Sequence, residues 1–79
     1  MKTVLKFYSP TCGPCKVMSK NLESIDDIEV VDVDITDDKN AELVDMYKIR
    51  AVPSIVILSE EGGIKHNGIL TVDKLKELL

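Results

Sequence analysis

Segments with strand character alternate with segments with helix character along the whole of this 79-residue chain. The strand segments are rich in β-branched and aromatic residues, and the helix segments carry apolar residues at intervals of three and four. The predicted elements are strands over 3–8, 28–35, 54–58 and 64–66 and helices over 14–24, 41–47 and 71–79. This β-α-β-α-β-β-α order predicts an α/β fold, a four-stranded mixed sheet covered by three helices, as a single domain over residues 1–79.

Local signals set several of the element boundaries. The run 54–58 is apolar almost throughout, which is typical of a strand covered on both faces. Gly62-Gly63 indicates a hairpin turn into the short strand that follows. Asp37 or Asp38 can cap the second helix, and Thr71 can cap the last one. The first two strands are joined through a helix, so we expect them to be parallel.

Charge and hydropathy exclude several function classes. The chain has 10 basic and 14 acidic residues, a formal net charge of −4, which is a poor match for the phosphate backbone of nucleic acid. No apolar run approaches the roughly 20 residues of a membrane helix, and Lys6 interrupts the apolar stretch that a signal peptide would need. We therefore expect a cytoplasmic protein without membrane contact. In such a reducing compartment, two cysteines three positions apart are more often catalytic or metal-binding than structural.

The two cysteines form the motif Cys12-Gly13-Pro14-Cys15, which falls between the first strand and the first helix. A thiolate at the N-cap position of Cys12 is stabilised by unpaired backbone N–H groups, and Lys16 adds a cation. Gly13 is expected to allow a tight turn, and Pro14 costs nothing in the first turn of a helix. The spacing lets Cys15 attack a mixed disulfide on Cys12. We therefore predict that Cys12 is the nucleophile and Cys15 the resolving thiol.

Other uses of the cysteine pair need different partners. A zinc site within one chain lacks ligands, because there is no second Cys pair and His66 is the single histidine. A zinc or iron–sulfur site that bridges two chains stays open, as does a pair of incidental buried cysteines. The strand before and the helix after the motif favour the redox interpretation, with no bound cofactor or metal.

Two segments resemble the thioredoxin family. Residues 7–16, Phe-Tyr-Ser-Pro-Thr-Cys-Gly-Pro-Cys-Lys, are similar to its active-site segment, and Ala51-Val52-Pro53-Ser54 is similar to the loop whose proline is cis in that family. The resemblance covers nearly the whole chain, but this sequence lacks the extra N-terminal strand and helix of full-length thioredoxins. The length matches the short glutaredoxin-like and the archaeal or phage-type thioredoxins.

The resemblance implies positions for substrate binding. Pro53 would pack against the disulfide, and the Val52 backbone would pair with an extended substrate chain. The alternative for Pro53 is a trans proline that begins a strand. Gly68 matches a glycine in the final loop of the family, near the disulfide, although it is also suited to an ordinary turn.

The chain departs from the family pattern around the motif. Thr11 stands where thioredoxins usually carry tryptophan, and Tyr8 either shields the disulfide or packs in the core. Lys6 stands where the family buries an aspartate, and Asp32 or Asp34 stands near the position of that aspartate's lysine partner. The pair would then be charge-swapped. Alternatively, Lys6 reaches water and both aspartates lie in solvent at the end of a strand.

These features together predict a thiol–disulfide oxidoreductase that reduces protein disulfides and serves electron transport and cell redox homeostasis. The implied partners are disulfide-containing target proteins and a thioredoxin-reductase-like electron donor, and we expect a monomer. One rival is a glutaredoxin that uses glutathione; glutaredoxins carry threonine at the position of Ala51 and a double glycine that the segment 67–73 lacks. Another rival is a redox-inert interaction module.

Overall fold

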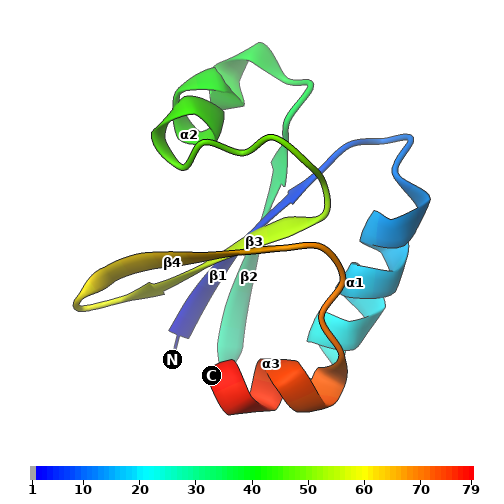
Figure 1. Cartoon of the computed structure of the whole chain (residues 1–79), viewed down its shortest axis with the longest axis vertical. Helices are drawn as coiled ribbons and strands as arrows, with labels where there is room; N and C mark the ends of the chain where they lie inside the picture. Colours follow the sequence, from blue (N-terminus) through cyan, green and yellow to red (C-terminus); the bar gives the residue numbers. More distant parts are fainter. Residues whose placement is uncertain (1) are drawn as a thin grey trace.

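The computed structural model describes residues 2–79 and contains the predicted sheet. The elements are β1 (Lys2–Tyr8), α1 (Gly13–Glu23), β2 (Ile28–Asp34), the short 3-10 helix η1 (Asp38–Asn40), α2 (Ala41–Met46), β3 (Ser54–Ser59), β4 (Gly62–Asn67) and α3 (Val72–Leu78). The strand order is β2-β1-β3-β4, with β1 parallel to β2 and antiparallel to β3, and β3 antiparallel to β4 (Figure 1). The α/β fold predicted from the order of the elements is therefore confirmed.

Helices cover both faces of the sheet. On one face, α1 and α3 pack against the sheet and bury the cluster Val4, Met18, Leu22, Ile55, Ile57 and Leu75. On the other face, the α2 region packs against the cluster Leu5, Phe7, Val33, Ile49 and Val56. Figure 1 shows α2 on the opposite side of the sheet from α1 and α3. The central strand β3 is buried from Ser54 to Ile57, as its apolar sequence predicts.

The hairpin between β3 and β4 turns two residues earlier than predicted. The turn is made by Glu60 and Glu61, whereas Gly62 and Gly63 begin β4, and Gly62 pairs with Ser59. A Cβ atom at Gly63 would lie 2.8 Å from Cγ1 of Val56, so the neighbouring strand requires glycine there. Neither glycine lies at the tip of the turn. Gly63 is required by close packing, and Gly62 has a φ of +113°, which favours glycine.

The second helical segment, predicted over 41–47, is α2 at Ala41–Met46, and the short helix η1 precedes it. Asp37 caps η1 by accepting a hydrogen bond from the N–H of Lys39, and α2 then spans only six residues. Met46 is 66% exposed, because so short a helix presents only one side to the sheet. In the described part of the chain, no helix has the length and apolar character that crossing a membrane requires.

Candidate active site

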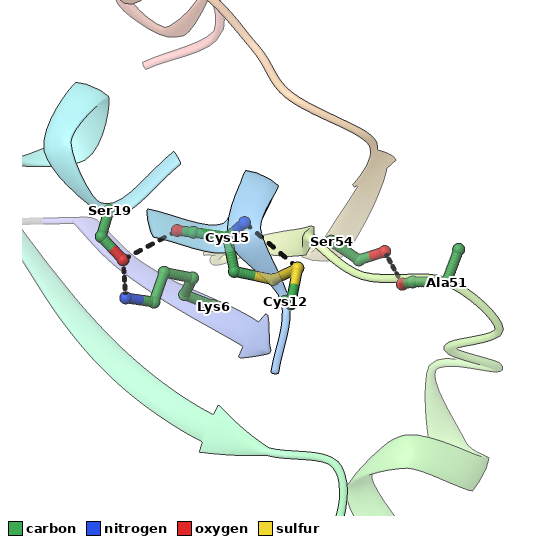
Figure 2. Close-up of a disulfide and its surroundings, with 6 residues drawn as sticks. All are labelled: Lys6, Cys12, Cys15, Ser19, Ala51 and Ser54. Carbon is green, nitrogen blue, oxygen red and sulfur yellow. Dashed lines mark hydrogen bonds between the residues drawn. A yellow bond between two sulfur atoms is a disulfide. The ribbon is translucent and has the colours of Figure 1, made fainter. Parts of the chain in front are cut away.

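Cys12 and Cys15 form a disulfide at the N-terminus of α1, with their Cα atoms 5.3 Å apart (Figure 2). Cys12 is the N-cap residue, and its Sγ accepts a hydrogen bond from the N–H of Cys15 at 3.1 Å. Pro14 lies in the first turn, where a missing N–H costs nothing. The strand and helix that flank the motif thus place Cys12 where the sequence predicted it, at the positive end of a helix.

The two sulfur-bearing residues differ in accessibility. Cys15 is 4% exposed, whereas Cys12 is half-buried and lies beside the exposed residues Gly13, Pro14 and Lys16. A large partner in solution can therefore reach Cys12 but not Cys15. This asymmetry is what a nucleophile and a resolving thiol require.

The prediction that Gly13 is needed for a tight turn is wrong. Its φ lies outside the left-handed region, and a Cβ atom built on it would meet nothing within 4 Å. The local turn therefore does not need glycine at this position. Gly13 instead leaves open surface directly beside Cys12.

The loop before β3 contains the predicted cis peptide bond, between Val52 and Pro53. Pro53 is buried, and its carbonyl accepts a hydrogen bond from the N–H of Gly68 at 2.9 Å. Gly68 has a φ of +82°, a conformation that favours glycine. The loop before β3 and the loop after β4 are thereby joined through these two predicted residues.

Ser54 fixes the same loop from the beginning of β3. It is fully buried, and its hydroxyl donates a hydrogen bond of 2.6 Å to the carbonyl of Ala51 (Figure 2). Its Oγ also lies 3.0 Å from Oδ1 of Asn67. Among residues 2–79, Val52 makes no hydrogen bond through its backbone. The loop is therefore held at both ends while its Val52 main chain remains free.

Lys6 and Asp32 form the charge-swapped pair that the sequence suggested. They are register partners on the parallel strands β1 and β2, and Lys6 Nζ lies 2.8 Å from Asp32 Oδ1. The Lys6 side chain is 10% exposed, whereas that of Asp32 is 58% exposed. Lys6 also donates a hydrogen bond to the hydroxyl of Ser19, which donates in turn to the carbonyl of Cys15 at 3.0 Å (Figure 2).

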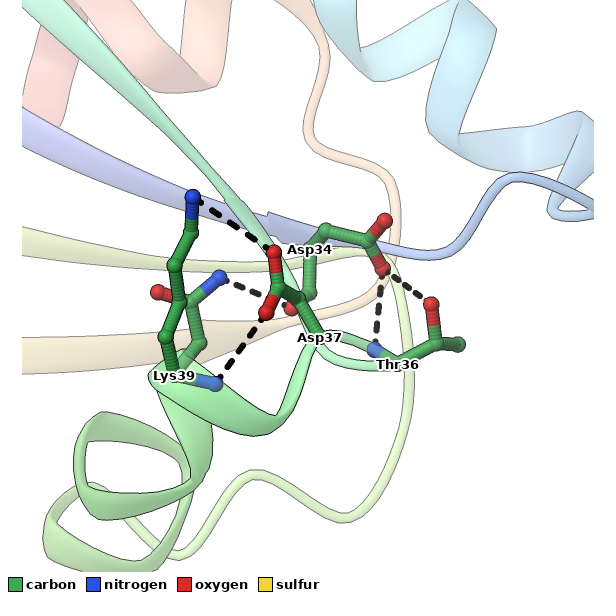
Figure 3. A network of polar contacts seen from close by, with 5 residues as sticks. Asp34, Thr36, Asp37 and Lys39 are labelled. Atoms are coloured by element: carbon green, nitrogen blue, oxygen red, sulfur yellow. Dashed lines mark hydrogen bonds and ion pairs between the residues drawn. The ribbon is translucent and has the colours of Figure 1, made fainter.

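Asp34, the other predicted partner of Lys6, does not pair with it. Its Oδ1 accepts hydrogen bonds from the N–H of Thr36 at 2.9 Å and from the Thr36 hydroxyl at 2.7 Å (Figure 3). Asp34 lies opposite Tyr8 in the register, one pleat beyond Lys6. Its carboxylate stabilises the turn after β2 and does not reach the cavity beside the disulfide.

A cavity of about 300 Å³ lies beside the disulfide. It is lined by Lys6, Tyr8, Ser9, Pro10, Cys12, Cys15, Lys16, Ser19 and Asp32. The half-buried ring of Tyr8 has its centroid 5.6 Å from Lys6 Nζ, so Tyr8 forms a wall of this cavity. Residues 2–79 contain no cluster of three or more His, Cys, Asp or Glu side chains that suits a metal ion.

Sequence reasoning did not identify the role of Ser19. The signal that was available is its spacing, because a residue four positions after Cys15 lies one turn along the same face of α1. Ser19 is half-buried and links Lys6 to Cys15. Ser54 and Asn67 were missed as well, because their contacts depend on how two distant loops meet.

Comparison with known proteins places this geometry in a family. The family model described as Thioredoxin matches residues 1–79. The chain is 32% identical to a thioredoxin of Mycoplasmoides gallisepticum, over 99% of this chain and 81% of that protein. It is also 32% identical to a prophage-derived thioredoxin-like protein of Bacillus subtilis, over 96% of this chain and 92% of that protein. A solved structure of a mutant thioredoxin from Halobacterium salinarum superposes with a TM-score of 0.83 at 28% identity, over 98% of this chain and 70% of that one.

The family match and the disulfide at the N-terminus of α1 agree with each other, since each alone indicates redox chemistry at a vicinal cysteine pair. The chain belongs to the thioredoxin family and is a thiol–disulfide oxidoreductase.

Proposed function

We propose that residues 1–79 act as one thioredoxin-like unit that reduces disulfides in target proteins through Cys12 and Cys15. The observation that carries this proposal is the asymmetry of the pair: Cys12 caps α1 and is half-buried, whereas Cys15 is 4% exposed. Only an accessible thiolate can open a disulfide in another protein. An inaccessible second thiol is protected from side reactions and is available only to the bond that forms on Cys12.

The proposed cycle transfers two electrons to the target. The Cys12 thiolate attacks one sulfur of the target disulfide, that S–S bond breaks, and the departing sulfur takes up a proton. The Cys15 thiolate then attacks Cys12 Sγ, which closes the Cys12–Cys15 disulfide and releases the second target sulfur as a thiol. A dithiol donor, such as a thioredoxin-reductase-like protein, must return two electrons to complete the cycle.

The loop at Val52 supports binding of an extended segment of the target. Its backbone has no hydrogen-bond partner among the described residues, so it is free to pair with the main chain of a substrate. Pro53 and Gly68, which are joined by a hydrogen bond of 2.9 Å, would hold this binding edge beside the disulfide. Recognition through main-chain groups does not depend on the side chains of the target, so a broad range of target proteins follows.

The cellular setting follows from the chemistry. Reduction of target disulfides fits the cytoplasm, where thiols are kept reduced, and would serve electron transport and redox homeostasis there. Both cysteines come from one chain, so the cycle needs no second copy and we expect a monomer to be active.

The test is a turnover assay with a protein disulfide, such as that of insulin, and a small dithiol as electron donor. The proposal predicts catalysis by the intact chain and none by Cys12→Ser. Catalysis that requires glutathione would instead identify a glutaredoxin-type enzyme. An intact chain without activity toward either class of disulfide would indicate an interaction module.

A further inference from the structure

Lys6 is the one charged residue that is buried among residues 2–79. Burial of an ammonium group is costly unless it is paired and hydrogen-bonded, so a buried lysine is rare without such partners. Lys6 lines the same cavity as Cys12 and Cys15. The cysteine cycle proposed above does not use it.

Two contacts fix the ammonium group of Lys6. It lies 2.8 Å from the Asp32 carboxylate and donates to the Ser19 hydroxyl, and Ser19 is bonded to the carbonyl of Cys15. Figure 2 shows the Lys6 side chain running beneath Cys15, with Nζ directed toward Ser19. The cation is therefore tied to the main chain of Cys15 by two successive hydrogen bonds.

We propose that Lys6 is a positioning residue that stabilises the thiolate of Cys15 when the disulfide is open. This inference rests on the proposed role of Cys15 as the resolving thiol. Lys6 and Cys15 line the same cavity, and a cation on the wall of such a cavity favours the ionised form of a thiol there. The low polarity of a buried site strengthens the effect. Resolution of the mixed disulfide would then be faster, because the attacking species is the thiolate. The proton that leaves Cys15 passes to water, and the released target thiolate takes one up.

Other charged groups that face this site modulate the effect. Asp32 on β2 partly offsets the Lys6 charge, although its 58% exposure lets water screen it. Lys16 on α1 lines the cavity and adds to the positive potential, and Tyr8 on β1 lines it as well. Glu23 lines a second cavity of about 180 Å³ with Lys6 and Asp32, on the side away from the cysteines.

The test uses two substitutions that change the charge in opposite directions. Lys6→Met keeps the apolar stem but leaves Asp32 without its cation, so it should disfavour the Cys15 thiolate. Asp32→Asn leaves the Lys6 ammonium unopposed, so it should favour that thiolate. If the pair had a purely structural role, the two substitutions would not change Cys15 ionisation in opposite directions, because both remove the same ion pair.

The measurement is the pH profile of Cys15 ionisation, followed by the ultraviolet absorbance of the thiolate in a Cys12→Ala background. Lys6→Met should shift the midpoint about half to one pH unit upward, and Asp32→Asn should shift it downward. The matched control is Lys39→Met, which removes the same charge from the exposed pair of Lys39 and Asp37 and should not shift the midpoint (Figure 3).

A second readout uses the intact cysteine pair. In single turnovers from a mixed disulfide on Cys12, Lys6→Met should slow resolution about three- to tenfold near neutral pH, in proportion to the lost thiolate. Midpoints that move in the same direction in both variants, or in neither, would overturn the inference. Reduction of protein disulfides by the wild-type chain would still support the proposed function in that case, so the two failures are distinguishable.

Discussion

Replacing Ser54 with alanine tests whether the loop beside the proposed binding edge is held as described. The hydroxyl is fully buried and donates a 2.6 Å hydrogen bond to Ala51. A hydrogen bond of this type contributes about 1 kcal/mol net to stability. For a chain of this length, with a total stability of roughly 4–12 kcal/mol, the loss should lower Tm by about 4–8 °C.

The same substitution should weaken substrate binding more than chemistry. The Ser54 hydroxyl bonds Ala51 and Asn67 rather than either cysteine, so kcat should change little. If all of the lost energy appears as poorer positioning of the loop at Val52, KM for a protein disulfide should rise up to about fivefold. Thermal melts and steady-state kinetics with a protein disulfide measure the two effects.

The matched control for Ser54→Ala is Ser59→Ala. Ser59 is exposed, and its hydroxyl bonds Gly62 at 3.2 Å in the hairpin, where water competes for the same groups. Its Tm and KM should stay near those of the wild type. An unchanged Tm and KM in Ser54→Ala, or equal losses in both variants, would refute the account of the loop.

Four further substitutions have defined outcomes. Cys15→Ser should trap a stable mixed disulfide between Cys12 and a target protein, visible by non-reducing electrophoresis, because no thiol remains to resolve it. Gly63→Ala should lower the free energy of unfolding by about 1–3 kcal/mol in denaturant melts, because its Cβ would lie 2.8 Å from a methyl group of Val56. Gly13→Ala is the control: its Cβ meets nothing within 4 Å, so the free energy of unfolding should change by less than about 0.5 kcal/mol. Gly68→Ala should cost about 1–2 kcal/mol for backbone conformation alone, because its φ is +82° and no atom crowds the site.

The fold could be predicted because its signals are local. The apolar run of β3 indicates a strand buried on both faces, and it forms the centre of the sheet with β1. The active-site disulfide was predictable for the same reason. A β-rich segment, a Cys-x-x-Cys motif and an amphipathic helix in succession leave the first cysteine at a helix N-terminus.

Features that depend on contacts between distant segments were not predictable. Asp32 and Asp34 share one face of β2, so the sequence leaves both as partners of Lys6, and the register of β1 and β2 selects Asp32. The glycine doublet was assigned to the turn because Gly-Gly is a strong hairpin signal. Gly63 is instead required by its close packing against Val56 on the neighbouring strand, and no local sequence pattern indicates that contact.

Ser19 shows a further limit of sequence patterns. A serine among lysines on a helix is normally solvent-facing, and its neighbour Lys20 is indeed exposed. Ser19 turns inward because a buried lysine on β1 offers it a donor. Its role therefore appears only when the helix is placed on the sheet.

Brief alkylation of the fully reduced protein distinguishes the nucleophile Cys12 from the resolving thiol Cys15. Peptide mapping after a short exposure near neutral pH measures the modification of each cysteine. Cys12 should be modified much faster, because it caps α1 and is half-buried while Cys15 is 4% exposed. Preferential modification of Cys15 would reverse the assigned roles, because it would make the buried residue the nucleophile.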